Sequence, residues 1–120
     1  MPHEADDASR LWDMLEAARK IQQFVAGKTL EAYSCDDMLQ AAVERKLEII
    51  GEAARNVSPE FQRGHPEIPW RGIISQRHFV AHEYGEIVQE KLWRVATVHV
   101  IELVTLLEPL IPPLPPAISE

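Results

Sequence analysis

Cysteine is almost absent from this chain of 120 residues, and its scarcity excludes a disulfide-stabilised fold. The single Cys35 cannot form an internal disulfide, and its neighbours Ser34, Asp36 and Asp37 provide no positive charge that would activate its thiol. The sequence therefore predicts a protein of a reducing, cytoplasmic compartment.

Positive charge is also scarce, since 12 Lys and Arg residues face 19 Asp and Glu residues and give a net charge of −7. Such a molecule as a whole repels phosphate backbones, so any nucleic-acid role must depend on a local patch. Residues 63–94 are the exception, with five Lys and Arg against four acidic residues and three of the five histidines. This segment is where we expect an anion to bind.

The chain lacks a long uninterrupted apolar run, a strand-period run, an internal repeat and a glycine-rich phosphate loop. Its most apolar region, residues 95–111, is interrupted by His99, Glu102 and Glu108, and its first ten residues are acidic. We therefore expect neither a membrane span nor a secretion signal.

Apolar residues recur at helical spacing, which predicts an all-α fold: an antiparallel helical bundle of four main helices plus a short helix. The main helices are predicted at residues 8–25, 35–57, 71–84 and 88–107, and the short helix at residues 58–64. The last helix becomes almost wholly apolar, so we expect it to be buried on more than one side, by the core or by another subunit. Residues 1–107 form the predicted domain, and the proline-rich residues 108–120 form a predicted extended tail.

The segment QRHFVAHEY, residues 76–84, concentrates the chemically versatile side chains. His78 and His82 are four residues apart, so both imidazoles could bind one metal ion from a single helical face. Phe79 stands where zinc-protease helices carry a glutamate, and a third ligand would have to be His65, His99 or a carboxylate. An ordinary polar helix face is the structural alternative.

Acid/base chemistry on a phosphodiester is the third interpretation of this segment. Arginine offers a planar donor fork to phosphate oxygens, and histidine titrates near neutral pH. Arg77 and His82 are five residues apart, roughly 140° around a helix, which hinders their convergence on one phosphate. A two-fold dimer could bring both residues from two chains around one cleft.

Residues 8–107 resemble the HEPN-domain proteins, specifically the HepT-like toxins. The resemblance is carried by IIGEAARN (residues 49–56), by the PEIPW turn (residues 66–70), and by the spacing of Arg77, His82 and Tyr84. It implies a homodimeric, metal-independent endoribonuclease without cofactors that acts as the toxin of a bacterial toxin–antitoxin pair. Its implied partner is a small MntA-like nucleotidyltransferase that adenylylates the motif tyrosine.

Carried over residue by residue, the resemblance implies that Arg77 holds the scissile phosphate, that His82 is the general acid/base, and that Tyr84 is the residue that becomes adenylylated. Two positions depart from the family pattern. His78 replaces the asparagine that usually follows the motif arginine, and Val88 stands where an aspartate or asparagine usually begins the last helix. His78 lies beside the site and could support phosphate binding. The alternative function is a catalytically silent dimeric module that binds a nucleotidyltransferase.

Overall fold

The computed structural model describes residues 2–75 and 86–111, which are almost entirely helical. These two ranges contain no strand, and the predicted all-α fold is confirmed. None of the helices in them is long and apolar enough to cross a membrane.

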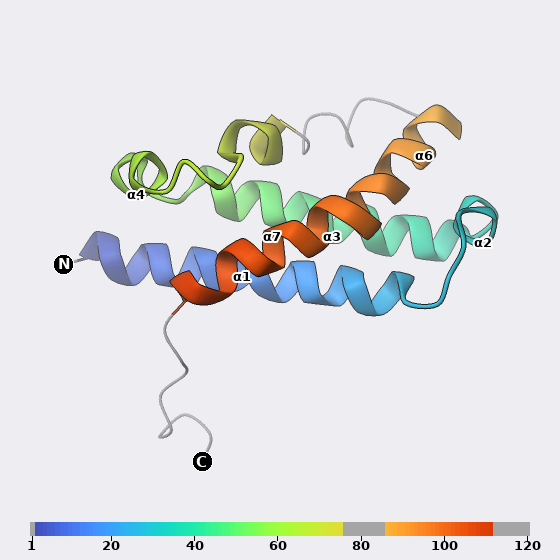
Figure 1. Cartoon of the computed structure of the whole chain (residues 1–120), viewed down its shortest axis with the longest axis horizontal. Coiled ribbons are helices and arrows are strands. Elements are labelled where there is room, and N and C mark those ends of the chain that lie inside the picture. Colours follow the sequence, from blue (N-terminus) through green and yellow to red (C-terminus); the bar gives the residue numbers. More distant parts are fainter. Residues whose placement is uncertain (1, 76–85, 112–120) are drawn as a thin grey trace, which may run out of the picture.

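Two long helices, α1 (Pro2–Val25) and α3 (Asp37–Arg55), lie side by side and form the most extensive helix pair of the described chain (Figure 1). Helix α1 begins earlier than the predicted Ala8. Gly27 follows its end with φ of 74°, a left-handed conformation that glycine adopts at little cost. The end of α1 at Val25 agrees with the predicted end of the first helix.

The start of α3 is determined by a side-chain cap. Asp36 Oδ1 accepts a hydrogen bond from the Leu39 backbone N–H at 3.0 Å, so the helix begins at Asp37, two residues after the predicted position. Gly51 of the IIGEAARN motif is buried within this helix.

A short helix that the sequence pattern did not predict, α2 (Leu30–Ser34), lies in the connection between α1 and α3. The Thr29 hydroxyl oxygen accepts a hydrogen bond from the Ala32 N–H at 3.0 Å and caps this helix. Gln40 Nε2 donates to the Tyr33 carbonyl at 2.8 Å and ties α2 to α3. Five residues are too few to display helical periodicity, which explains why the pattern missed it.

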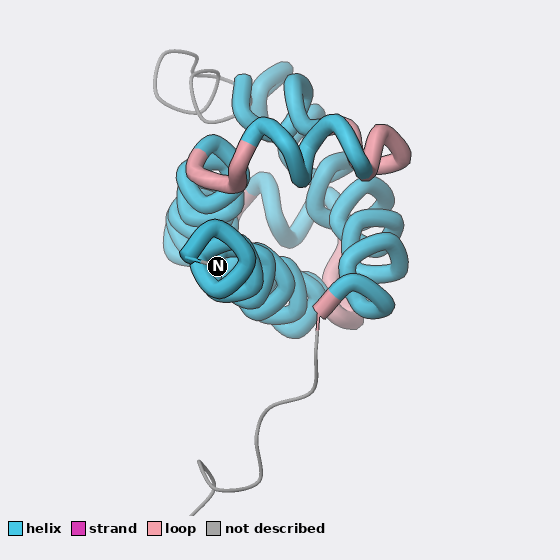
Figure 2. Tube along the Cα trace, turned by 90° about the vertical axis from the view of Figure 1, so that its left-hand side faces the viewer, coloured by secondary structure: helices cyan, strands magenta, loops and turns pink. Residues whose placement is uncertain are grey.

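The last part of the described chain is one continuous helical run of changing type, which crosses obliquely over α1 and α3 (Figures 1 and 2). It consists of α6 (Glu86–Arg94), the π-helical η1 (Val95–His99), α7 (Val100–Leu107) and the 3₁₀ turn η2 (Glu108–Leu110). The predicted start at Val88 is wrong, because the chain is already helical at Glu86. Val88 is only 7% exposed and lies inside the helix, so it does not occupy a cap position.

Residues 108–110 differ from the extended tail that their proline content predicted. Pro109 occupies one of the first positions of η2, where a missing N–H costs nothing. Leu110 and Ile111 pack, partly buried, against the core. The division between residues 1–107 and 108–120 stays a prediction, and residues 112–120 lie outside the described chain.

The core is formed by the inner faces of α1, α3 and the last helical run. Its large side chains that are at most 2% exposed include Leu11, Met14, Ile21, Val43, Leu47, Leu92 and Leu107. The short helix α4 (Pro59–Gly64) packs its Phe61 against this core. It confirms the short helix predicted at residues 58–64, and Ser58 caps it, because Ser58 Oγ accepts from the Phe61 N–H at 3.2 Å.

A buried carboxylate holds the start of α4 against α1. Asp7 Oδ1 accepts from the Ser58 N–H at 2.8 Å, and Asp7 Oδ2 accepts from the Ser58 hydroxyl at 2.7 Å. The two residues are 6% and 9% exposed, so neither bond is replaced easily by water.

We expect Asp7→Ala to lower the free energy of unfolding by about 1–3 kcal/mol, because it leaves the buried Ser58 N–H without an acceptor. Urea unfolding followed by circular dichroism measures this loss. Asp6→Ala is the matched control, since Asp6 is exposed on the same helix and should change stability by less than about 0.5 kcal/mol. Equal midpoints for the two variants would contradict the role assigned to Asp7.

Candidate functional site

The four residues that the sequence predicts for the site, Arg77, His78, His82 and Tyr84, all lie outside the described residues. Their roles therefore stay predictions. The structure does describe both flanks of their segment: a helix at residues 70–75 leads into it, and α6 follows it. The two flanks are therefore what the structure shows of this region.

Trp70 anchors the entering flank. Its indole Nε1 donates a hydrogen bond to the His65 carbonyl at 3.0 Å, and its ring meets the Phe61 ring edge-on at a centroid distance of 6.2 Å. Trp70 is 7% exposed, and Ile68 on the same connection is 1% exposed. The PEIPW turn thus fixes the direction in which the helix at residues 70–75 begins.

The leaving flank is held against α2 and α3. Gln89 Nε2 donates to Glu44 Oε2 at 3.0 Å, and Trp93 packs against the buried Tyr33 with ring centroids 5.2 Å apart. Burial raises the pKa of Tyr33 well above its ordinary value, and the nearby Glu44 carboxylate adds to the effect. Tyr33 therefore stays protonated at neutral pH and serves as a packing residue.

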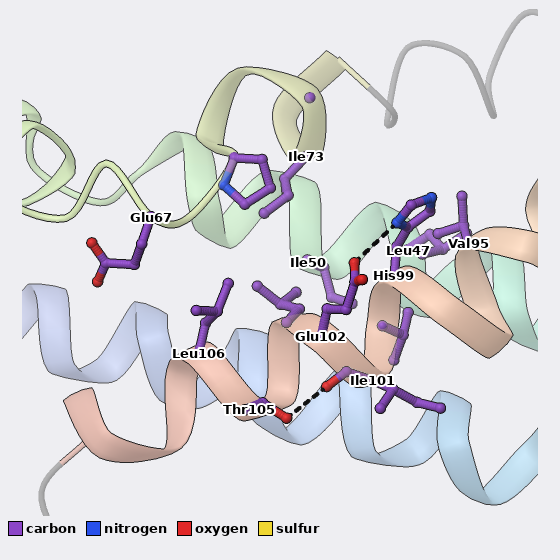
Figure 3. Close-up of a pocket in the computed structure, with 14 residues that line it drawn as sticks. Leu47, Ile50, Glu67, Ile73, Val95, His99, Ile101, Glu102, Thr105 and Leu106 are labelled. Carbon is purple, nitrogen blue, oxygen red and sulfur yellow. Dashed lines mark hydrogen bonds and ion pairs between the residues drawn. The ribbon is translucent and has the colours of Figure 1, made fainter.

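A groove of about 670 Å³ runs along η1 and α7, and we call it the α7 groove. Leu47, Ile50 and Leu106 are apolar parts of its lining (Figure 3). The opposite wall is formed by residues 67–73, which include Ile73 and precede the motif segment in the sequence. The sequence pattern did not predict this groove. The sequence feature that could have indicated the groove is the almost wholly apolar last helix.

Polar side chains stand at the edges of the α7 groove. His99 Nδ1 lies 3.3 Å from Glu102 Oε1, and both residues are well exposed (Figure 3). Glu67 lies at the other wall, where its carboxylate is 3.1 Å from His65 Nδ1. Two hydrogen bonds keep the pKa of the Glu67 carboxyl below its ordinary value. The bond from the Glu67 backbone N–H has the larger effect, and the bond from His65 has the smaller one.

The metal hypothesis named His65 and His99 as third ligands. In the structure each of them faces a carboxylate, and the described residues contain no group of three or more His, Cys, Asp or Glu side chains placed to hold a metal ion. Because His78 and His82 lie outside these residues, the two-histidine site itself stays an untested alternative.

Comparison with known proteins adds to this geometry. The family model described as ribonuclease HepT-like matches residues 14–110. A probable ribonuclease HepT from Thermococcus cleftensis is 42% identical over 84 residues, which cover 70% of this chain and 76% of the relative. No solved structure matches this chain.

Two further relatives carry names of the same kind. A putative RNase from Methanocaldococcus jannaschii is 35% identical over 85 residues, covering 71% of this chain and 70% of the relative. A putative RNase from Caldanaerobacter subterraneus is 32% identical over 90 residues, covering 75% and 80%. The helical architecture, the matched region and these relatives agree with the sequence resemblance, and the chain belongs to the HepT-like ribonuclease family.

Proposed function

We propose that this chain is a metal-independent endoribonuclease in which His82 is the general acid/base and Arg77 holds the scissile phosphate. Membership of the HepT-like ribonuclease family carries this proposal. The segment that contains Arg77 and His82 follows the anchored Trp70 in the sequence and precedes α6, which Gln89 ties to α3.

The chemistry follows from the residue types. His82 accepts the proton of a ribose 2′-hydroxyl, and the 2′-oxygen attacks the adjacent phosphorus. The bond from phosphorus to the 5′-oxygen breaks, and a second imidazole returns a proton to the departing oxygen. The products are a 2′,3′-cyclic phosphate and a free 5′-hydroxyl, while Arg77 offsets the charge that grows on the phosphate oxygens.

Two copies of the chain form the site in this proposal. Arg77 and His82 lie roughly 140° apart if their segment is helical, so one copy places them poorly around a single phosphate. A two-fold dimer supplies both residues twice, and the two copies of His82 then serve as base and acid. His78 is the supporting residue, because a histidine next to Arg77 offers a further hydrogen bond to phosphate.

The biological role that we propose is that of a toxin in a toxin–antitoxin pair, acting on RNA in the cytoplasm. Its antitoxin is an MntA-like nucleotidyltransferase that adenylylates Tyr84. The added phosphate places negative charge and bulk two residues from His82, where it competes with RNA for Arg77. Modification thereby turns off the same site that cleaves RNA.

A catalytically silent dimeric module that binds the nucleotidyltransferase is the second candidate function. The net charge of −7 favours it, because an acidic protein attracts RNA weakly, and so does His78 in place of the usual asparagine. If the unmodified protein leaves RNA intact, His78→Asn is the first variant in which we expect activity to appear.

We expect the purified protein to cleave total RNA in the presence of EDTA and to leave DNA of the same sequence intact, because DNA lacks the attacking 2′-hydroxyl. Gel electrophoresis detects cleavage, and enzymatic end analysis detects the cyclic phosphates. Intact RNA with folded, unmodified protein would favour the silent module. Cleavage that appears only when a divalent metal is added would contradict metal independence.

A further inference from the structure

Two buried polar atoms lie at the end of the bundle where α2 and α6 meet (Figure 1). They are the hydroxyl oxygen of Tyr33 in α2 and Oε1 of Gln89 in α6. Neither atom reaches solvent, and neither has a hydrogen-bond partner among the residues that the structure describes. Buried polar atoms of folded proteins almost always have a partner, so these two atoms require an explanation.

Glu44 of α3 fixes the orientation of the Gln89 amide. Gln89 Nε2 donates a hydrogen bond to Glu44 Oε2 at 3.0 Å. A carboxylate only accepts hydrogen bonds, so turning the amide over would lose this bond and place the amide oxygen against the Glu44 oxygens. Gln89 Oε1 therefore cannot gain a partner by exchanging places with Nε2, and it remains an acceptor that needs a donor.

The Tyr33 hydroxyl is a donor in the same neighbourhood. Tyr33 is 0% exposed, and its ring centroid lies 5.2 Å from that of Trp93, which follows Gln89 by one helical turn. Burial raises the pKa of Tyr33, and the Glu44 carboxylate raises it further, so the hydroxyl keeps its proton at neutral pH. Because Glu44 acts on Tyr33 and bonds to Gln89, the three side chains surround one small buried region between α2, α3 and α6.

We propose that this region binds a single water molecule, which bridges the Tyr33 hydroxyl and Gln89 Oε1. The water accepts the hydrogen of the Tyr33 hydroxyl and donates one of its own hydrogens to Gln89 Oε1. Its second hydrogen points to the Glu44 carboxylate, which completes three hydrogen bonds, the usual number for a buried water. Both buried protein atoms thereby gain the partner that the described residues do not supply.

Ions fit this region less well than water does. An anion would meet the Glu44 carboxylate at close range. The described residues place no group of three or more His, Cys, Asp or Glu side chains where they could hold a metal ion, so a metal would lack ligands here. Water matches the site because it accepts from the Tyr33 hydroxyl and donates to the Gln89 and Glu44 oxygens at the same time.

The bridge ties the rotation of α6 to the positions of α2 and α3. Apolar contacts are non-directional and tolerate small rotations of a helix, whereas hydrogen bonds weaken steeply when their angles change. Only one rotation of α6 lets Gln89 meet the Glu44 carboxylate and the water together. The inference does not depend on the proposed ribonuclease activity, because the bridge lies wholly among described residues and its test uses no RNA.

A double-mutant cycle on the full chain tests the bridge. Tyr33→Phe removes only the hydroxyl, and Gln89→Met removes the amide while keeping a side chain of similar length. Each single variant should lower the folding equilibrium constant about fivefold, measured by urea unfolding at one fixed protein concentration. We expect the double variant to lose at least about threefold less than the product of the two single losses, because both substitutions remove the same water-mediated link.

Glu90→Met is the matched control for Gln89→Met. Glu90 is the next residue of α6 and is exposed, so its side chain takes no part in the buried region. Combined with Tyr33→Phe, Glu90→Met should give the product of the two single effects to within about twofold. If Tyr33→Phe and Gln89→Met also combine as a simple product, the two side chains are not linked and the proposal is wrong.

A high-resolution crystal structure of the full chain separates a water bridge from a direct bond. We expect a water oxygen within about 2.6–3.2 Å of both Tyr33 Oη and Gln89 Oε1. In crystals of the Tyr33→Phe, Gln89→Met double variant this water should be lost, since its two main partners are gone. A wild-type structure without this water, including one in which the Tyr33 hydroxyl bonds directly to Gln89 or Glu44, would overturn the proposal even if the cycle shows coupling.

Discussion

Replacing His82 with alanine should lower the rate of RNA cleavage by about 10²–10⁴-fold without unfolding the protein. The alanine side chain cannot accept the proton of the 2′-hydroxyl, nor can it return one to the departing 5′-oxygen. Because both copies of a dimer carry the substitution, base and acid are lost together. Initial rates on a fluorescent RNA oligonucleotide measure the effect.

His65→Ala is the matched control for this result. His65 stands on the connection before Trp70, is partly exposed, and lies 3.1 Å from Glu67, away from the motif segment in the sequence. Its loss should change the rate less than about threefold. If the wild-type protein cleaves RNA and His82→Ala cleaves it at the same rate, the catalytic role assigned to His82 is wrong.

Replacing Ile21 with alanine should lower the free energy of unfolding by about 2–5 kcal/mol. Ile21 is 0% exposed in α1, the helix that packs against both α3 and α7, and its truncation leaves a cavity in the core. Domains of this size are stable by only about 5–15 kcal/mol, so the loss is a large fraction of the total. Urea unfolding at several protein concentrations measures it.

Lys20→Ala is the control, because Lys20 is exposed on the same turn of α1 and alanine favours the helix. We expect its stability to stay within about 0.5 kcal/mol of wild type. Measuring at several concentrations separates folding from dimerisation, since dimer dissociation makes the unfolding midpoint depend on concentration. If Ile21→Ala lowers the free energy of unfolding by less than about 1 kcal/mol, the stability of the core does not depend on the Ile21 side chain.

The candidate site shows what residue patterns in a sequence can predict. The spacing of Arg77, His82 and Tyr84, with IIGEAARN and PEIPW before it, led to the family that the comparisons then confirmed. Motifs of this kind are readable because the chemistry requires particular residue types at particular intervals. The chemical roles of these residues stay predictions, since their segment lies outside the described chain.

Several features of the fold depended on packing between distant residues. The bond between Asp7 and Ser58 joins positions 51 residues apart, and neither residue stands out in the local pattern. Val88 was read as the start of a helix, yet it is buried inside a helix that has already begun. Sequence periodicity reports which face of a helix is apolar, but it does not report which neighbour covers that face.

The sequence by itself determined the helical content, the approximate position of most helices, the family and the candidate catalytic residues. Each of these depends on residues close together along the chain, through helical periodicity, capping side chains and motif spacing. Only the tertiary structure decided the presence of α2, the π-helical turn at Val95–His99, and the groove between α7 and residues 67–73. These arise where segments far apart in the sequence meet, and their shape depends on how side chains from several helices fill the space between them.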